Sequence, residues 1–182
     1  MRYDRQIPHL PKWAADNGCF AQGDQFDGIA YLHWLSGLQH LRESCLFAVA
    51  PDVVGDAAAT LKRSRPYLSI MRGLGFPVAY VAQDGFVSKH IPWDALEVLF
   101  LGGTDAFKLH PRTEYIVREA KERGKHVHAG RVNSYERLEL MTSWGCDTAD
   151  GTYIAFAPNL HLDNILRWLN RVNSLQQLPF LH

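Results

Sequence analysis

Short apolar runs alternate with polar loops and amphipathic segments along most of this chain, and this alternation limits the possible folds more than any other feature. Leu46–Ala50 is apolar at every position and is followed by Asp52 in a polar loop, which is typical of a strand buried on both faces. Asp56 can then cap a helix over residues 57–72. Strands that alternate with helices pair in parallel through right-handed crossovers. The pattern therefore predicts an α/β fold with a parallel sheet.

The same cycle repeats along the chain, so about six strands are expected. The predicted strands cover residues 13–15, 46–50, 78–81, 98–101, 126–128 and 146–149. The predicted helices cover residues 26–41, 57–72, 112–123, 134–144 and 162–172. Polar loops follow every strand, which favours a (β/α) barrel with its site at one end. Such barrels usually need about 250 residues, so we expect a reduced, compact TIM-like barrel over 1–182 as a single domain, partly open or completed by a partner.

The ends of the chain and its composition exclude several classes of protein. The segment up to Pro11 is expected to be an irregular arm, and residues 176–182 an edge-covering extension. With 19 basic and 19 acidic residues, the net charge is zero, so nucleic-acid binding would need a local patch. Three widely spaced cysteines form neither a disulfide framework nor a zinc knuckle. Neither a membrane span nor a signal peptide is visible, so we expect an intracellular, cytoplasmic protein with no membrane partner.

Asp150 is the residue that the predicted strand order places best for chemistry. It follows the small residues Cys146, Thr148 and Ala149, which suit a short packed strand, and precedes Gly151, which allows close approach of a backbone or substrate. A carboxylate at the carboxyl end of a parallel strand lies where α/β enzymes place their sites. The alternative is that Asp150 and Gly151 form an ordinary turn.

The loops, taken in order, resemble those of the tRNA-guanine transglycosylases and of the related compact phage and bacterial enzymes that insert 7-deazaguanines into DNA. The resemblance lies in five stretches: residues 16–20 (DNGCF), 51–52 (PD), 81–85 (VAQDG), 101–104 (LGGT) and 145–150 (GCDTAD). It implies a glycosyltransferase that exchanges guanine for a 7-deazaguanine of the preQ0 type. The exchange would proceed by double displacement through a covalent bond between the sugar and an aspartate.

This resemblance also implies roles for individual residues. Asp150 would be the nucleophile and Asp16 the general acid and base. The substrate base would be bound by Asp52, Gln83, Gly102, Gly103 and Phe20. Three further residues lie beside predicted loop ends, where they would contact phosphates or simply face solvent: Lys108, His128 and Arg131.

Two departures from that family shape the predicted cofactor and partners. The tRNA enzymes carry a zinc site of three cysteines and a histidine near the C-terminus, whereas the last cysteine here is Cys146, so no cofactor is expected. Residues 151–153 replace the Pro-Thr-Arg that follows the nucleophile, which favours DNA over tRNA as the polymer. The predicted partners are therefore DNA and a free 7-deazaguanine base, with a homo-oligomer as a possibility.

Other functions are compatible with the same residues. A base-excising DNA glycosylase would use the same Asp150. His126 and His128 lie on one side of a predicted strand, so with Asp150 and Asp16 they suggest a metal-dependent TIM-barrel hydrolase. A third alternative is a relative that binds nucleic acid without catalysis.

Overall fold

The fold is known from a computed structural model, which describes residues 12–176. The predicted N-terminal arm and all but the first residue of the predicted C-terminal extension lie outside the described residues.

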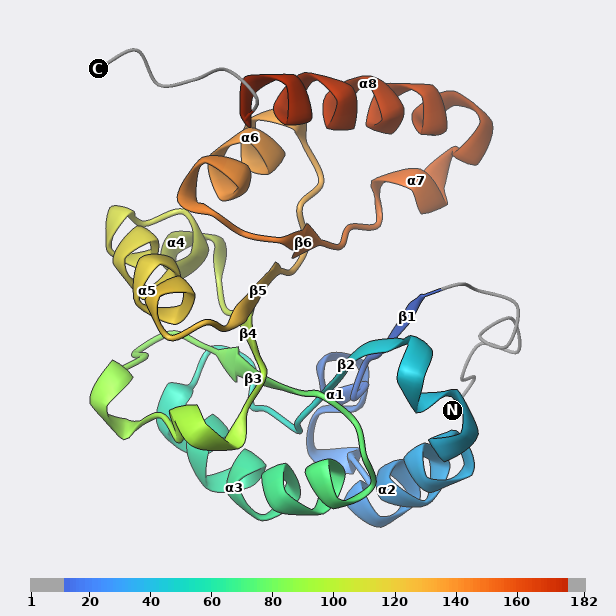
Figure 1. The fold of residues 1–182 in the computed structure, drawn as a ribbon, viewed down its shortest axis with the longest axis vertical. Coiled ribbons are helices and arrows are strands. Elements are labelled where there is room, and N and C mark those ends of the chain that lie inside the picture. The colour runs from blue at the N-terminus through green and yellow to red at the C-terminus, as the bar shows by residue number, and fades with distance from the viewer. Residues whose placement is uncertain (1–11, 177–182) are drawn as a thin grey trace.

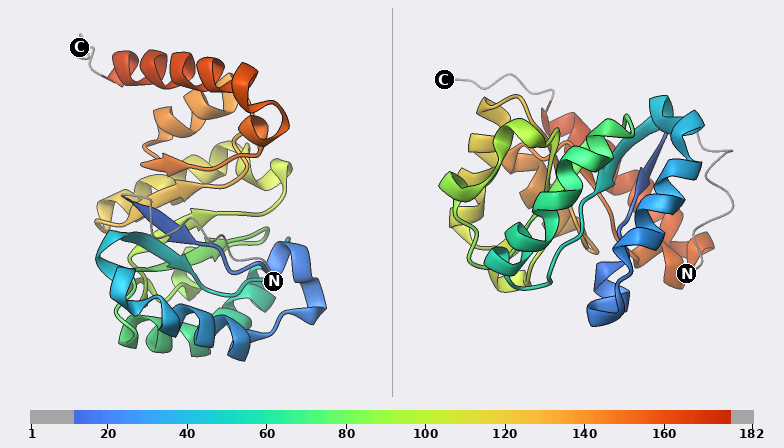
Figure 2. Two further views of the ribbon diagram at one scale, coloured as in Figure 1. Left: turned by 90° about the vertical axis from the view of Figure 1, so that its right-hand side faces the viewer. Right: turned by 90° about the horizontal axis from the view of Figure 1, so that it is seen from below.

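Six parallel strands form one sheet in which sequence neighbours are also spatial neighbours, in the order β1-β2-β3-β4-β5-β6. The strands are β1 (Trp13–Ala15), β2 (Cys45–Val49), β3 (Val78–Ala82), β4 (Val98–Leu101), β5 (His126–Ala129) and β6 (Thr148–Ala149). The sheet curls into a half-barrel with helices around it (Figures 1 and 2). The predicted compact, partly open TIM-like barrel is confirmed.

Most strands are joined by helices, as the alternating pattern predicts. The α-helices are α1 (Cys19–Gln22), α2 (Gly28–Gly37), α3 (Ala57–Gly73), α4 (Asp105–Lys108), α5 (Pro111–Glu122), α6 (Tyr135–Trp144), α7 (Tyr153–Phe156) and α8 (Pro158–Gln176). The 3₁₀ helices are η2 (Gly23–Gln25), η3 (Gln39–Ser44), η4 (Ser88–His90) and η5 (Trp93–Ala95). The Asp56 carboxylate accepts a hydrogen bond from the Ala59 N–H at 2.9 Å and caps α3, as predicted. The predicted helix over residues 26–41 ends at Gly37, where the chain continues into η3.

Side chains alternate between the two faces of the curled sheet, and this alternation separates the core from the site. One set packs against the helices: Tyr80, Leu99 and Val127 join residues of α5 and α6 in the largest buried cluster. The other set faces the concave side, where Phe47 and Phe100 belong to a separate, smaller cluster. Because side chains alternate with a period of two, each strand contributes one set of side chains to the core and the other set to the concave face where the site lies.

The C-terminal helix α8 covers the β6 side of the molecule and lies against α6 (Figure 1). Within residues 12–176, no helix combines the length and the apolar character that crossing a membrane requires. The cytoplasmic location stays a prediction.

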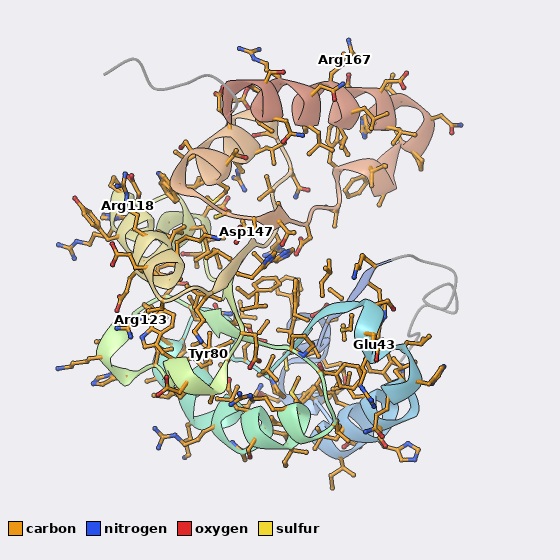
Figure 3. All side chains as sticks on the ribbon, viewed as in Figure 1. Glu43, Tyr80, Arg118, Arg123, Asp147 and Arg167 are labelled. Atoms are coloured by element: carbon orange, nitrogen blue, oxygen red, sulfur yellow. The ribbon has the colours of Figure 1, made fainter. Side chains whose placement is uncertain are left out.

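Two buried tyrosines provide a test of the packing. Tyr31 and Tyr80 are 0% and 1% exposed, but only the Tyr31 hydroxyl has an assigned acceptor, the Val49 carbonyl at 2.8 Å. The Tyr80 hydroxyl (labelled in Figure 3) has no hydrogen-bond partner among the described residues. We expect Tyr80→Phe to raise the free energy of unfolding by about 1 kcal/mol and Tyr31→Phe to lower it by about 1–3 kcal/mol.

Urea denaturation of the two variants beside the unmodified protein measures both effects. A loss of stability in Tyr80→Phe would contradict this account of the core, because it would mean that the hydroxyl is satisfied by a buried water.

Candidate functional site

A cavity of about 520 Å³ opens at the carboxyl ends of the strands, on the concave face of the sheet. Every site residue predicted from the sequence lines it: Asp16, Phe20, Asp52, Gln83, Gly102, Gly103, Lys108, His128, Arg131 and Asp150. These residues come from all parts of the chain because the carboxyl ends of parallel strands meet at one edge of the sheet. Their convergence is a fact of the fold, whereas their roles stay predictions.

Asp52 is buried in the wall of the cavity and held by two amide side chains. Its Oδ1 accepts from Asn17 Nδ2 at 2.9 Å and its Oδ2 accepts from Gln83 Nε2 at 2.6 Å. Both amides are fixed in orientation, because the Asn17 oxygen accepts from the Cys19 N–H and the Gln83 oxygen accepts from the Gly55 N–H. Burial raises the pKa of Asp52, with the negative charge of Asp16 as a lesser contribution, although the two amide hydrogen bonds oppose the rise.

Asp150 lies at the end of β6 with half of its side chain (51%) exposed to the cavity and solvent. Its Oδ2 is 3.0 Å from His128 Nε2, and its Oδ1 accepts from the backbone N–H of Arg131 at 2.9 Å. Desolvation acts to raise the pKa of this carboxyl, but the hydrogen bonds and the positive charge of Lys108 outweigh it and lower the pKa. Asp150 is therefore an ionised group that faces the cavity.

Arg131 adopts an uncommon backbone conformation. Its φ of 62° lies in the left-handed region, and it is the only described residue other than glycine with a positive φ. This conformation accompanies the hydrogen bond from its N–H to Asp150. Its guanidinium lies over the Phe20 ring, 4.2 Å from the centroid. Phe20, which follows β1, and Arg131, which follows β5, thus meet at the edge of the cavity.

Lys108 is a buried cation in the same wall, only 4% exposed. Its Nζ donates to the Gly130 carbonyl at 3.0 Å and lies 3.7 Å from Asp105. Burial lowers its pKa, and Arg131 and Arg137 lower it further, against the opposing effect of Asp105. A buried lysine with one carbonyl acceptor and one distant carboxylate has donors left for an anionic ligand.

The site also includes residues, in and behind the cavity wall, that the motif comparison did not single out. The rings of Phe47 and Phe100 form its apolar floor beside His128, at centroid distances of 4.9 and 4.6 Å from the imidazole. Thr148 supports His128 from the neighbouring strand through a contact of 2.8 Å. Strand parity was the signal for Phe100 and Thr148, since they lie two residues before Gly102 and Asp150.

The two histidines of β5 do not form the metal site that was considered from the sequence. His126 Nε2 and His128 Nδ1 both contact Thr148 Oγ1 at 2.8 Å, and His128 Nε2 contacts Asp150. A metal ligand must present a free nitrogen lone pair to the ion. In residues 12–176, no group of three or more His, Cys, Asp or Glu side chains is arranged to hold a metal ion. The predicted alternative, a metal-dependent hydrolase that binds its metal through His126 and His128, is therefore wrong.

Comparison with known proteins gives no match to a family model and no match to a curated protein. Three solved structures are similar to part of this chain. The phosphodiesterase PaMucR in complex with c-di-GMP is 14% identical with a TM-score of 0.48, over 79% of this chain and 60% of that chain. The EAL domain of Xanthomonas citri FimX in complex with c-diGMP is 16% identical with a TM-score of 0.47, over 78% and 57%. The EAL enzyme Bd1971, bound to cAMP and cyclic-di-GMP, is 14% identical with a TM-score of 0.43, over 77% and 38%.

This chain thus spans between 38% and 60% of the length of these neighbours. At these identities and TM-scores, no residue role is carried over from the neighbours to this chain.

The neighbours overturn the family predicted from the loops, since they are EAL proteins and not tRNA-guanine transglycosylases. The physical reason for the error is that Asp, Gln and Gly recur at the carboxyl ends of parallel strands whenever loops build a site there. The five matching stretches all lie at or beside such strand ends. Their order follows the strand order, which any barrel with sequential strands shares.

The functional predictions that rested on this family are corrected with it. Guanine exchange, base excision and the glycosyltransferase class are not retained, because PaMucR is a phosphodiesterase and hence a hydrolase. The expected partners, DNA and a free 7-deazaguanine base, are likewise corrected, because the neighbours hold c-di-GMP or cAMP. The expectation of no cofactor came from comparison with the zinc-binding transglycosylases and loses its basis.

The opposite pKa directions of the two cavity carboxyls can be measured. We expect Asp150 to titrate below the ordinary value of an aspartate and Asp52 above it, by carbon-13 NMR of the carboxyl groups. Asp150→Asn and Asp52→Asn assign the two signals. Both groups titrating at the ordinary value would contradict the electrostatics described above.

The same pKa directions give opposite signs for stability against pH. The folded pKa of Asp150 lies below its unfolded value, so its stabilisation is present above the unfolded pKa and is lost as the pH falls through the folded pKa. The folded pKa of Asp52 is raised, so its stabilisation is present below the unfolded pKa and is lost as the pH rises through the folded pKa.

Proposed function

We propose that this chain is a hydrolase that binds a small nucleotide through its base and cleaves a phosphoester bond, with Asp150 as the general base. The observation that carries this proposal is the opposite environment of Asp150 and Asp52 in one cavity. When the surroundings of two carboxyl groups shift their pKa values in opposite directions, the two groups can take different roles. The group with the lowered pKa is charged and accepts a proton, whereas the group with the raised pKa can stay neutral and donate a hydrogen bond. Asp150 is placed for the first role, and burial shifts the pKa of Asp52 in the direction of the second.

The wall around Asp52 supports recognition of a planar nitrogen heterocycle. The amides of Asn17 and Gln83 occupy both oxygens of Asp52, but each oxygen keeps a second lone-pair position toward the cavity. The rings of Phe47 and Phe100 supply an apolar surface beside this polar edge. Apolar walls with a few fixed polar groups are the usual composition of small-molecule sites.

The cations beside Asp150 support a phosphate on the bound molecule. Lys108 and Arg131 line the same cavity as Asp150, and both act electrostatically on the groups around it. The carboxylates of Asp16 and Asp150 also line the cavity, so an anionic ligand needs these two cations to offset their repulsion. Gly102 and Gly130 lie near the mouth without side chains; a Cβ on Gly130 would lie 2.6 Å from the Phe100 ring.

In the proposed reaction, Asp150 takes a proton from a water molecule while the water oxygen bonds to phosphorus. The phosphorus–oxygen bond to the leaving alcohol breaks, and the proton held by Asp150 passes to that alcohol. Lys108 and Arg131 neutralise the charge that develops on the phosphoryl oxygens. His128 and the Arg131 N–H keep the carboxylate in place, because each holds one of its oxygens.

Removal of the Asp150 charge tests the reaction. The full chain is incubated with cAMP, cyclic-di-GMP and bis(p-nitrophenyl) phosphate, and product release is followed by chromatography and absorbance. We expect hydrolysis of at least one of these probes, and a fall in kcat of about 10²–10⁴-fold for Asp150→Asn. Asp163→Asn, an exposed substitution on α8, is the matched control and should retain full activity.

Hydrolysis should also weaken as the pH falls through the pKa of Asp150, since the protonated carboxyl cannot accept the proton. No hydrolysis of any probe by the unmodified chain, or full activity of Asp150→Asn, would overturn the proposal.

The anion site gives a separate prediction. Lys108→Met keeps the length of the side chain but removes the charge, so the KM for the hydrolysed probe should rise about tenfold or more, in line with the loss of one charge-assisted hydrogen bond. Lys89→Met, at an exposed position on η4, should leave the KM unchanged. An unchanged KM in Lys108→Met would remove Lys108 from the site.

A further inference from the structure

Four side chains form a continuous hydrogen-bonded row on the concave face of β5 and β6. His126 Nε2 lies 2.8 Å from Thr148 Oγ1, and the same oxygen lies 2.8 Å from His128 Nδ1. His128 Nε2 then lies 3.0 Å from Asp150 Oδ2. The row exists because His126 and His128 are two residues apart on β5, while Thr148 is the register partner of His128 on β6.

The chemistry of these groups determines which atom donates in each contact. An ionised carboxylate only accepts, so His128 must donate its Nε2–H to Asp150. A neutral imidazole has one N–H, so His128 Nδ1 is an acceptor and the Thr148 hydroxyl donates to it. A hydroxyl has one proton, so toward His126 the Thr148 oxygen can only accept, and His126 donates its Nε2–H. All three hydrogen bonds therefore run in one direction, from His126 as the first donor to Asp150 as the last acceptor.

The other end of the row is anchored outside the cavity. His126 Nδ1 is 3.8 Å from Asp147 Oδ2, and Asp147 (labelled in Figure 3) is paired with Lys121 Nζ at 2.6 Å. His126 and Asp147 are each 33% exposed, so this end is open to solvent. Burial lowers the pKa of His126, and the charge of Lys121 lowers it further, while Asp147 opposes them. The Phe47 ring is the apolar neighbour of His126 across the concave face.

We propose that Thr148 and His126 are positioning residues that act through His128: together they fix its imidazole as the Nε2–H tautomer and so hold Asp150 ionised toward the cavity. The catalytic importance of this row rests on the proposed function, whereas the tautomer itself does not. Neither Thr148 nor His126 lines the cavity, so neither is placed to touch a substrate there.

The physical argument is that this tautomer is selected from both ends of the imidazole, because Asp150 accepts from Nε2–H and the Thr148 hydroxyl donates to Nδ1. Without the Thr148 proton, His128 can move its own proton to Nδ1 and present a bare Nε2 to Asp150. Two acceptors would then face each other at 3.0 Å, and the carboxylate would lose a hydrogen bond that keeps its pKa low. Outer residues that orient a histidine in this way are commonly worth 10–100-fold in activity.

Imidazole nitrogens report their protonation directly, so the test uses nitrogen-15 NMR of histidine-labelled protein. In the unmodified chain at neutral pH, His128 should show a protonated Nε2 and an unprotonated Nδ1, and His126 a protonated Nε2. Thr148→Val removes the hydroxyl with little change in shape, and His128 should then show both tautomers. Thr148→Ser keeps the hydroxyl and should restore the single tautomer. His126→Phe removes the donor to Thr148 and should give a partial mixture.

The pH dependence supplies a second readout. In Thr148→Val the pKa of Asp150 should rise toward its ordinary value, because the remaining groups that face it are Lys108 and the Arg131 N–H. If the proposed hydrolysis is observed, kcat should fall about 10–100-fold and the acidic limb of its pH profile should move to higher pH. Thr148→Ser should retain both the profile and most of the activity.

The outcomes separate this inference from the proposed function. A single Nε2–H tautomer of His128 in Thr148→Val, with an unchanged Asp150 pKa, would overturn the inference whether or not the chain is active. The expected tautomers without hydrolysis of any probe would support the row and contradict only the proposed function. If Thr148→Val does not fold, as judged by circular dichroism, His126→Phe decides the same question.

Discussion

The alternation of side chains along six parallel strands is the constraint on which the rest of this structure depends. On the convex side it delivers Tyr80, Leu99 and Val127 to the helices, where they form the buried core. On the concave side it delivers Phe47, Phe100 and His128 to one cavity. A shift of one residue in any strand would exchange these two sets. The core and the site are therefore specified by the same register.

The site is held mainly by hydrogen bonds whose direction is fixed by backbone groups. Asn17 and Gln83 cannot turn their amides over, because their oxygens already accept from the backbone N–H groups of Cys19 and Gly55. Asp150 is held in the same way by the Arg131 N–H, at a position where the backbone adopts a left-handed conformation. Fixed donors of this kind pre-organise a site, because little reorganisation is needed when charge develops.

The opposite pKa directions of Asp52 and Asp150 illustrate how position on the sheet decides chemistry. Both are aspartates that follow a strand, but Asp52 is 7% exposed and receives hydrogen bonds only from neutral amides. Asp150 is half exposed and lies near Lys108 and His128. Desolvation dominates in the first case, and hydrogen bonding with nearby positive charge dominates in the second.

The amino-acid sequence by itself determined the strands, most of the helices and the parallel arrangement, because apolar periodicity and polar strand ends are local signals. Its loops and strand ends also supplied ten of the residues that line the cavity. It did not determine the function, since loops rich in Asp, Gln and Gly occur at the strand ends of unrelated barrels, and those loops led to the wrong family. Only the tertiary structure decided how neighbouring strands pair, and hence that Thr148 lies between His126 and His128 and contacts one nitrogen of each. Contacts between strands 20 or more residues apart depend on register and burial, and neither is written in any short stretch of sequence.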